Sequence, residues 1–110
     1  AEQGYEVHLI DAVPLHIEQA RVASKSQSAQ LVNIIVGDAR QLNQVSNSAD
    51  AVLLLGPLYH LIERSDRVTA LREAHRVLKS EGLIFAAGIS RFASTLDGLF
   101  SGYLDDPDFV

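Results

Sequence analysis

The sequence lacks several features that mark particular classes of protein. It has no cysteine, which excludes a disulfide framework and a thiolate metal site and fits a cytoplasmic protein. It has no run of lysine or arginine and a net charge of −5, so this segment is not expected to bind nucleic acid. Its apolar runs are far shorter than the ~20 residues of a membrane span, so no membrane association is expected.

The sequence also contains no methionine and no glycine-rich turn near its beginning. A complete reading frame encodes a methionine at its start, and Gly4 is typical of the residue that ends a helix, so Ala1 is expected to interrupt a longer protein. An acid at the end of a nucleotide-binding strand normally works with a glycine-rich turn about 20 residues earlier. Only ten residues precede Asp11, so half of such a site is expected to be missing.

What the chain does contain is a regular succession of short apolar runs. Its 110 residues, 47% of them hydrophobic, suffice for one globular domain or part of one. Strands are expected at residues 5–10, 31–36, 50–55 and 83–89, with helices at 14–24 and from Ser65 or Asp66 to about residue 78. Each run ends at a small or acidic residue, as in parallel strands whose carboxyl ends face a ligand, with helices on the faces of the sheet.

The segments between the strands carry further signals. Pro14 suits the first turn of a helix, the run at residues 5–10 predicts a strand covered on both sides, and residues 40–49 predict a loop with a short turn of helix. Glu73 and Arg76 are spaced to form an ion pair one helical turn apart. Val68, Leu71, His75 and Leu78 are expected to lie on one face of the second helix. Residues 92–104 show helical spacing but remain ambiguous.

Asp11, at the end of the first predicted strand, is the first candidate binding residue. A carboxylate in this position can accept hydrogen bonds from the 2′- and 3′-hydroxyls of a ribose. The alternative is that Asp11 caps the helix that begins at Pro14. Taken alone, the residue leaves both interpretations open.

Asp38 and Ala39 follow the second predicted strand. The Asp38 carboxylate can accept from an exocyclic amine while the backbone N–H of Ala39 donates to a ring nitrogen, and together these contacts recognise adenine. The alternative is an ordinary Gly-Asp turn, which Gly37 and Asp38 also suit.

The segment from Gly56 to His60 follows the third predicted strand. Gly56 allows a ligand to approach the backbone closely, and Tyr59 and His60 can orient a substrate or exchange a proton. The alternative is that Tyr59 packs over the loop and His60 bonds to the backbone. No orienting carboxylate can be identified from spacing, so Tyr59 and His60 are only weak catalytic candidates and the catalytic residues stay unknown. The other histidines lack metal-ligand spacing, so no metal site is expected.

Taken in order, these pieces resemble the class I S-adenosylmethionine-dependent methyltransferases, particularly those that act on small molecules. The resemblance covers residues 1–89 and is most specific over residues 50–82, where an aspartate-led apolar strand, a Leu-Tyr-His-Leu loop and a helix ending Arg-Val-Leu-Lys precede a glycine. It implies a Rossmann-like, doubly wound α/β fold with a mostly parallel sheet. Residues 1–110 are then part of one methyltransferase domain with its second to fifth strands. Residues 90–110 are a tail or the start of a substrate region.

The resemblance implies a role for each residue on the cofactor side. Asp11 corresponds to the acid that binds the ribose of S-adenosyl-L-methionine, and Ala12 and Val13 to residues that pack near the adenine. Asp38 and Ala39 correspond to the pair that reads the adenine edge. The family's glycine-rich first motif, which holds the methionine portion of the cofactor, is absent.

The resemblance also assigns a substrate side. Gly56 corresponds to the residue beside the methionine part of the cofactor, and Pro57, Leu58, Tyr59 and His60 to the lining of the substrate site. The partner implied is a small-molecule methyl acceptor. A nucleobase is not favoured, because Gly-Pro-Leu-Tyr replaces the Asp/Asn-Pro-Pro-aromatic pattern of many enzymes that methylate base amino groups.

The absent first strand has a structural consequence. In the family it lies between the second and fourth strands, so these two strands must pair directly, leave a gap or borrow a strand from another chain. Exposed strand edges of this kind invite self-association. We expect the fragment to be inactive alone.

Two other functions stay open. An acid after the second strand also suits the ribose of NAD, which makes half of a dinucleotide-binding oxidoreductase the first alternative. The Gly-Asp-Ala and Arg-Val-Leu-Lys-x-x-Gly pieces speak against it. The second alternative is a catalytically dead Rossmann-like module that serves in binding or dimerisation.

Overall fold

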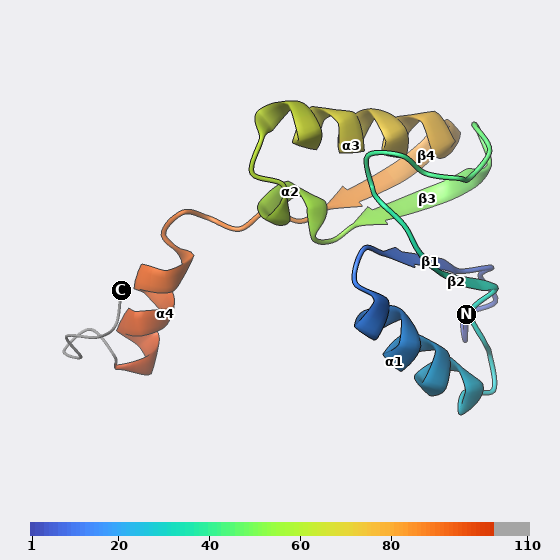
Figure 1. The fold of residues 1–110 in the computed structure, drawn as a ribbon, viewed down its shortest axis with the longest axis horizontal. Helices are drawn as coiled ribbons and strands as arrows, with labels where there is room; N and C mark the ends of the chain where they lie inside the picture. Colours follow the sequence, from blue (N-terminus) through green and yellow to red (C-terminus); the bar gives the residue numbers. More distant parts are fainter. Residues whose placement is uncertain (103–110) are drawn as a thin grey trace.

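A computed structural model of the chain describes residues 1–102, in which strands and helices alternate (Figure 1). The elements of this part follow the order β1 (His8–Asp11), α1 (Pro14–Lys25), β2 (Asn33–Val36), β3 (Ala49–Leu54), α2 (Pro57–His60), α3 (Arg64–Val77), β4 (Leu78–Ala86) and α4 (Ala93–Ser101). All strand pairing is parallel, and helices connect or cover the strands. The structure thus confirms an α/β fold that corresponds to part of a Rossmann-like domain.

The strands described form two separate parallel pairs. β1 pairs with β2, where Asp11 lies opposite Val36, and β3 pairs with β4, where Leu53 lies opposite Phe85. Within residues 1–102 no ladder joins one pair to the other. Of the three arrangements expected for an absent central strand, the structure therefore shows the gap, with the two pairs lying one above the other in Figure 1.

Each strand pair is covered by one helix. α1 packs on β1 and β2 through the fully buried Ile17, and α3 packs on β3 and β4. The buried face of α3 consists of Ala70, Ala74 and Val77. Of the residues expected on one face, Val68 is half-buried and Leu78, the first residue of β4, is buried, whereas Leu71 is 38% exposed and His75 is also exposed. Small alanines let the helix approach the sheet closely, whereas the prediction had followed the larger apolar side chains.

Several boundaries also differ from expectation. α3 has Glu63 at its N-cap position without any side-chain cap, and it ends at Val77. β4 begins directly at Leu78, but the register shifts between its first and second pairings with β3, so that residues 79–82 bulge out of the ladder. Residues 40–48 contain no helix, whereas the short helix α2 occupies the stretch expected to be a loop.

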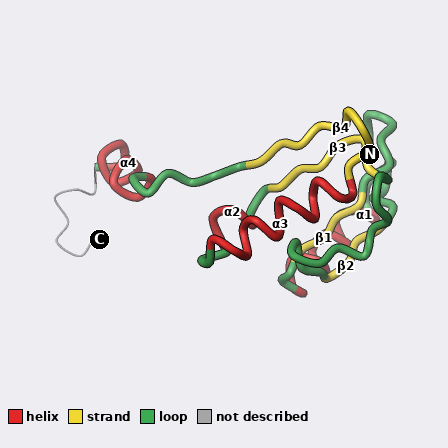
Figure 2. Tube along the Cα trace, turned by 90° about the horizontal axis from the view of Figure 1, so that it is seen from above, coloured by secondary structure: helices red, strands yellow, loops and turns green. Residues whose placement is uncertain are grey.

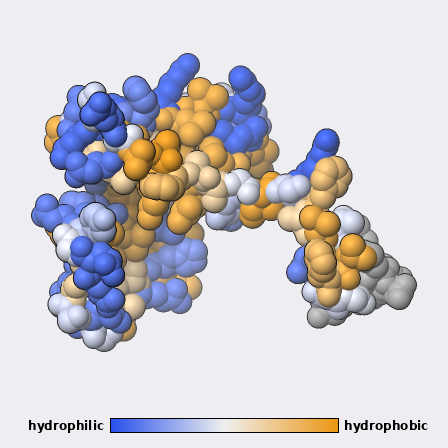
Figure 3. All heavy atoms as spheres, turned by 180° about the vertical axis from the view of Figure 1, so that it is seen from behind, coloured by the Kyte–Doolittle hydropathy of each residue, from blue (hydrophilic) through white to orange (hydrophobic). Residues whose placement is uncertain are grey.

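The second face of the β3–β4 sheet is bare. Leu54 points towards α3 and is 6% exposed, whereas Leu53 and Phe85, on the opposite face, are 66% and 53% exposed. Figure 3 shows hydrophobic residues gathered over this part of the molecule. The first strand is likewise less covered than its sequence predicted, since none of the residues of β1 is buried.

The C-terminal part of the described chain stands apart from the strand pairs. Figure 2 shows an extended segment that leads from β4 to α4, well away from the other helices. α4 forms within the described part of the segment with helical spacing and ends at Ser101, followed by Gly102 with φ 74°. The remaining expectations for residues 103–110 lie outside the described residues. None of the helices in residues 1–102 is both long and apolar enough to cross a membrane.

Candidate functional site

Asp11 and Asp38 lie at the same edge of the β1–β2 sheet. Asp11 is the last residue of β1 and lies opposite Val36, the last residue of β2. The backbone N–H of Gly37 donates to the carbonyl oxygen of Asp11 at 3.0 Å, which extends the ladder by one bond. A Cβ at Gly37 would lie 2.7 Å from Cγ2 of Ile10, so only glycine permits this close approach. The backbone thus brings the two predicted binding carboxylates together.

The Asp11 carboxylate is held by groups at the start of α1. Its Oδ1 accepts from the backbone N–H of Val13 at 2.7 Å, and its Oδ2 lies 3.2 Å from Nδ1 of His16. The Val13 N–H bond is the main cause that lowers the pKa of Asp11, with further contributions from His16 and His60 and a partial opposition from burial. Asp11 is therefore an ionised acceptor that also stabilises the turn into the helix, but it does not cap α1, whose N-cap residue is Val13 and which has no side-chain cap.

The remaining lone pairs of Asp11 decide whether it can also hold a ribose. A carboxylate offers about four acceptor positions, of which Val13 and His16 use two. The side chain is 36% exposed, so the other positions are open to a ligand. Two free acceptors match the two neighbouring hydroxyls of a ribose.

The Asp38 carboxylate is held by Arg40. Oδ1 accepts from the backbone N–H of Arg40 at 2.8 Å, and Nη2 of Arg40 lies 2.7 Å from Oδ2. The Arg40 guanidinium is the main cause that lowers the pKa of Asp38. The backbone N–H of Gln41 also donates to the carbonyl oxygen of Asp38 at 3.0 Å, so the segment forms the Gly-Asp turn as well as presenting a carboxylate. Ala39, between these residues, is half-buried.

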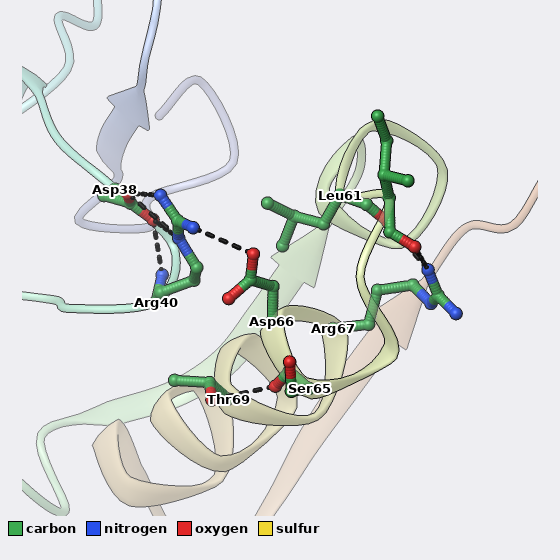
Figure 4. A network of polar contacts seen from close by, with 8 residues as sticks. Asp38, Arg40, Leu61, Ser65, Asp66, Arg67 and Thr69 are labelled. Carbon is green, nitrogen blue, oxygen red and sulfur yellow. Dashed lines mark hydrogen bonds and ion pairs between the residues drawn. The ribbon is translucent and has the colours of Figure 1, made fainter.

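The beginning of α3 anchors both sides of the candidate site (Figure 4). Asp66 accepts from Nη1 of Arg40 at 3.0 Å, which ties the end of β2 to this helix. One residue later, Arg67 donates from Nη1 to the carbonyl oxygens of Leu61 and Ile62, just after α2. Sequence reasoning missed this network. The Asp-x-Arg spacing at residues 38–40 was an available signal, but nothing local to it pointed to a partner 26 residues away.

The segment on the predicted substrate side forms the short helix α2. Gly56 is buried and adopts φ 136°, a conformation that L side chains rarely take, and its carbonyl oxygen accepts from the backbone N–H of His60 at 3.0 Å. The rings of Tyr59 and His60 lie 4.7 Å apart with a tilt of 53°. Pro57 and Leu58 are half-buried. His60 makes a small contribution to the lowered pKa of Asp11.

His60 has no hydrogen-bonded side-chain partner in the described part of the chain that would orient its ring. Residues 1–102 show no side-chain hydrogen bond to His60, so its orienting group is not identified there. In the same residues, no group of three or more His, Cys, Asp or Glu side chains could hold a metal ion. Two shallow hollows lie elsewhere, beside α1 and beside the bulge at residues 79–82. The side chains of Asp11 and Asp38 are 36% and 46% exposed, so the candidate site at the carboxyl ends of β1 and β2 is open to solvent.

The loop between β2 and β3 is fastened by the predicted pair of Glu73 and Arg76. The pair forms at 2.8 Å, and Glu73 Oε2 also accepts from the backbone N–H of Leu42 at 2.8 Å. Arg76 donates to the carbonyl oxygens of Leu42 and Gln44, each at 2.9 Å. The ion pair is confirmed, and its additional contacts hold the segment that follows Asp38.

Comparison with known proteins agrees with this arrangement. The crystal structure of PH0226 protein from Pyrococcus horikoshii OT3 is similar with a TM-score of 0.74 and 27% identity, over 88% of this chain and 46% of that chain. The chain therefore spans about half the length of this relative. None of the curated proteins matches the sequence. Residues 1–86 match the family described as methyltransferase domain, which favours methyl transfer over the dinucleotide-binding alternative. The chain belongs to the methyltransferase domain family.

Proposed function

We propose that this chain carries the nucleoside-binding part of an S-adenosylmethionine-dependent methyltransferase that acts on a small-molecule acceptor. The observation that supports this most directly is the pair of Asp11 and Asp38 at the ends of adjacent parallel strands. Both carboxylates have a lowered pKa and are ionised acceptors near neutral pH. Ligands bind at this edge of parallel α/β sheets, where polar groups from neighbouring strands converge.

Each part of the nucleoside has a matching group in the proposal. The two free acceptor positions of Asp11 bind the 2′- and 3′-hydroxyls of the ribose. Asp38 accepts from the exocyclic amine of adenine, and the backbone N–H of Ala39 donates to the ring. Ala12 and Val13, both exposed at the start of α1, cover the face of the base.

The remaining candidate residues orient the reacting groups. S-adenosylmethionine, when bound, supplies a methyl group already activated by its positive sulfonium. The protein then needs to position the acceptor and exclude water rather than provide a nucleophile. Gly56 leaves space beside the end of β3, and the residues of α2 form the side that faces the acceptor. We assign no general base.

In this proposal the described residues bind the nucleoside, and they include no glycine-rich turn to hold the methionine portion. We therefore expect the 110-residue chain to bind adenosyl ligands weakly and to show no methyl transfer by itself. Because the chain is expected to make few contacts with the methionine portion, we expect it to bind S-adenosylhomocysteine and adenosine with similar affinities.

Calorimetric titration of the chain with S-adenosylhomocysteine, adenosine and NAD tests the proposal. We expect both adenosyl ligands to bind, and Asp11→Asn to weaken each on the order of tenfold, because one charge-assisted contact is lost. Asp50→Asn is the matched control, since Asp50 is an exposed carboxylate at the opposite end of β3 and pairs with Lys79. Tighter binding of NAD would favour the oxidoreductase alternative. Absence of binding by all three ligands would leave the binding or dimerisation module.

A further inference from the structure

Arg40 restricts how the Asp38 carboxylate can receive a ligand. Oδ1 accepts from the backbone N–H of Arg40 at 2.8 Å and from its Nε at 3.0 Å. Oδ2 accepts from Nη2 at 2.7 Å and, more weakly, from the same Nε at 3.1 Å. The three N–H groups of Arg40 therefore use three of the carboxylate's about four acceptor positions, with the Nε–H shared between Oδ1 and Oδ2. One acceptor position of the carboxylate remains for a ligand.

The guanidinium that imposes this restriction is itself fixed from the other side. Nη1 of Arg40 lies 3.0 Å from Oδ2 of Asp66, in the first turn of α3. Figure 4 shows Arg40 between the two carboxylates, which come from different elements of the fold. A planar guanidinium with several donors in fixed directions can hold two carboxylates in this way, whereas a lysine ammonium acts as a point charge. Arg40 and Asp66 thus set the direction of the free acceptor position of Asp38, which follows the end of β2.

We propose that Arg40 is a positioning residue that makes the Asp38 site accept an amino group and reject a carbonyl oxygen at the same position of a purine. This rests on the proposed function, because it takes the base read by Asp38 to be adenine. A single free acceptor on an ionised carboxylate suits an N–H donor and repels a carbonyl oxygen. Near neutral pH the Asp38 carboxyl is ionised, and Arg40 lowers its pKa further, so the group has no proton to donate to a carbonyl.

The consequence concerns adenine against hypoxanthine. Hypoxanthine has a carbonyl oxygen in place of the amine and carries a hydrogen on the neighbouring ring nitrogen. A carboxylate released from Arg40 can turn and accept from that ring N–H, whereas the restrained carboxylate cannot. Loss of Arg40 is therefore expected to reduce the preference for adenine more than it reduces binding in general.

The test compares S-adenosylhomocysteine with S-inosylhomocysteine on the chain. We expect the wild type to prefer the adenosyl ligand on the order of tenfold or more, as for one hydrogen bond to a charged group. Arg40→Gln should bring the two affinities within about threefold of each other, and Arg40→Lys should restore only part of the preference. Arg72→Gln, an exposed arginine of α3, is the control and should leave the ratio unchanged.

The ratio separates positioning from a general loss of structure, which weakens both ligands alike. A wild-type ratio in Arg40→Gln, with adenosyl binding retained, overturns the inference and leaves the proposed function standing. If the wild type binds neither ligand, the proposed function fails and this inference fails with it. If thermal melting shows that Arg40→Gln does not fold, Asp66→Asn takes its place. That variant keeps the Asp38–Arg40 contact but releases its far side, so its ratio should fall partway, and an unchanged ratio would refute the inference.

Discussion

Nδ1 of His16 lies 3.2 Å from Oδ2 of Asp11, so the first turns of α1 contact the carboxylate that ends β1. The two residues are five positions apart, and the turn through Val13 brings them together. His16 is one of the groups that lower the Asp11 pKa. The contact thus joins a residue that the sequence had left without a role to the proposed ribose site.

This contact predicts how ligand binding depends on pH. Because the Asp11 pKa is lowered, affinity for adenosine should decline at a lower pH than it would for an ordinary aspartate. His16→Gln removes one of the lowering interactions, so the decline should begin at a higher pH. Titrations with adenosine from pH 7 down to about pH 2.5 cover the ordinary aspartate range and the range below it. The control is His8→Gln, at the amino end of β1, where His8 contacts Asn33. Identical pH profiles for wild type and His16→Gln would contradict the prediction.

Glu73 predicts a pH dependence of stability. The Arg76 guanidinium, together with the Leu42 N–H, lowers the pKa of Glu73 from 4.5 to about 2. A carboxylate with a lower pKa in the folded state stabilises the fold fully above its unfolded pKa, and this contribution is lost as the pH falls towards the folded value. Wild type should therefore melt at a higher temperature than Glu73→Gln at pH 7, with the difference disappearing between about pH 4.5 and 2. Glu18→Gln, which removes an exposed carboxylate 3.8 Å from Arg21, should show no such convergence.

Gly56 predicts a backbone effect at the end of β3. Its φ of 136° is strained for any residue with a side chain, although the nearest atom to an added Cβ, on His60, is 3.7 Å away. Gly56→Ala should destabilise the fold by about 1–3 kcal/mol through backbone strain rather than a clash. Gly88→Ala serves as the control, since nothing lies within 4 Å of that site and its φ is not positive. Urea unfolding of the two variants measures the difference, and equal stabilities would argue against strain at Gly56.

The bare face of the β3–β4 sheet predicts self-association. Leu53 and Phe85 are register partners, and both are more than half exposed on that face. Contiguous exposed apolar surface and unpaired strand edges favour contact with a second copy of the chain. Sedimentation equilibrium should show a mass that rises with concentration, and Leu53→Lys should reduce it. Val45→Lys, at an equally exposed valine in the loop before β3, should not. A monomer at all concentrations would refute the prediction.

The strands and the positions of the two carboxylates could be predicted from sequence because their signals are local. Asp11 and Asp38 each follow an apolar run directly, and parallel pairing then places both at one edge. The buried face of α3 could not be predicted in the same way, because Ala70 and Ala74 are buried by close approach to the sheet rather than by their own hydrophobicity. Arg40 was missed because its role depends on Asp66, whose position follows only from the packing of α3.

The separation of the strand pairs has a consequence for how the chain opens. Each pair has its own parallel ladder and its own covering helix, and within residues 1–102 no ladder bond is shared. Opening β1–β2 breaks no ladder bond of β3–β4, so we expect the amide protons of the two pairs to exchange with solvent as separate cooperative groups. The hydrogen bond from Arg40 to Asp66 and the one from Arg76 to the loop after β2 connect the two groups. We therefore expect the opening of one group to depend on the other through these contacts.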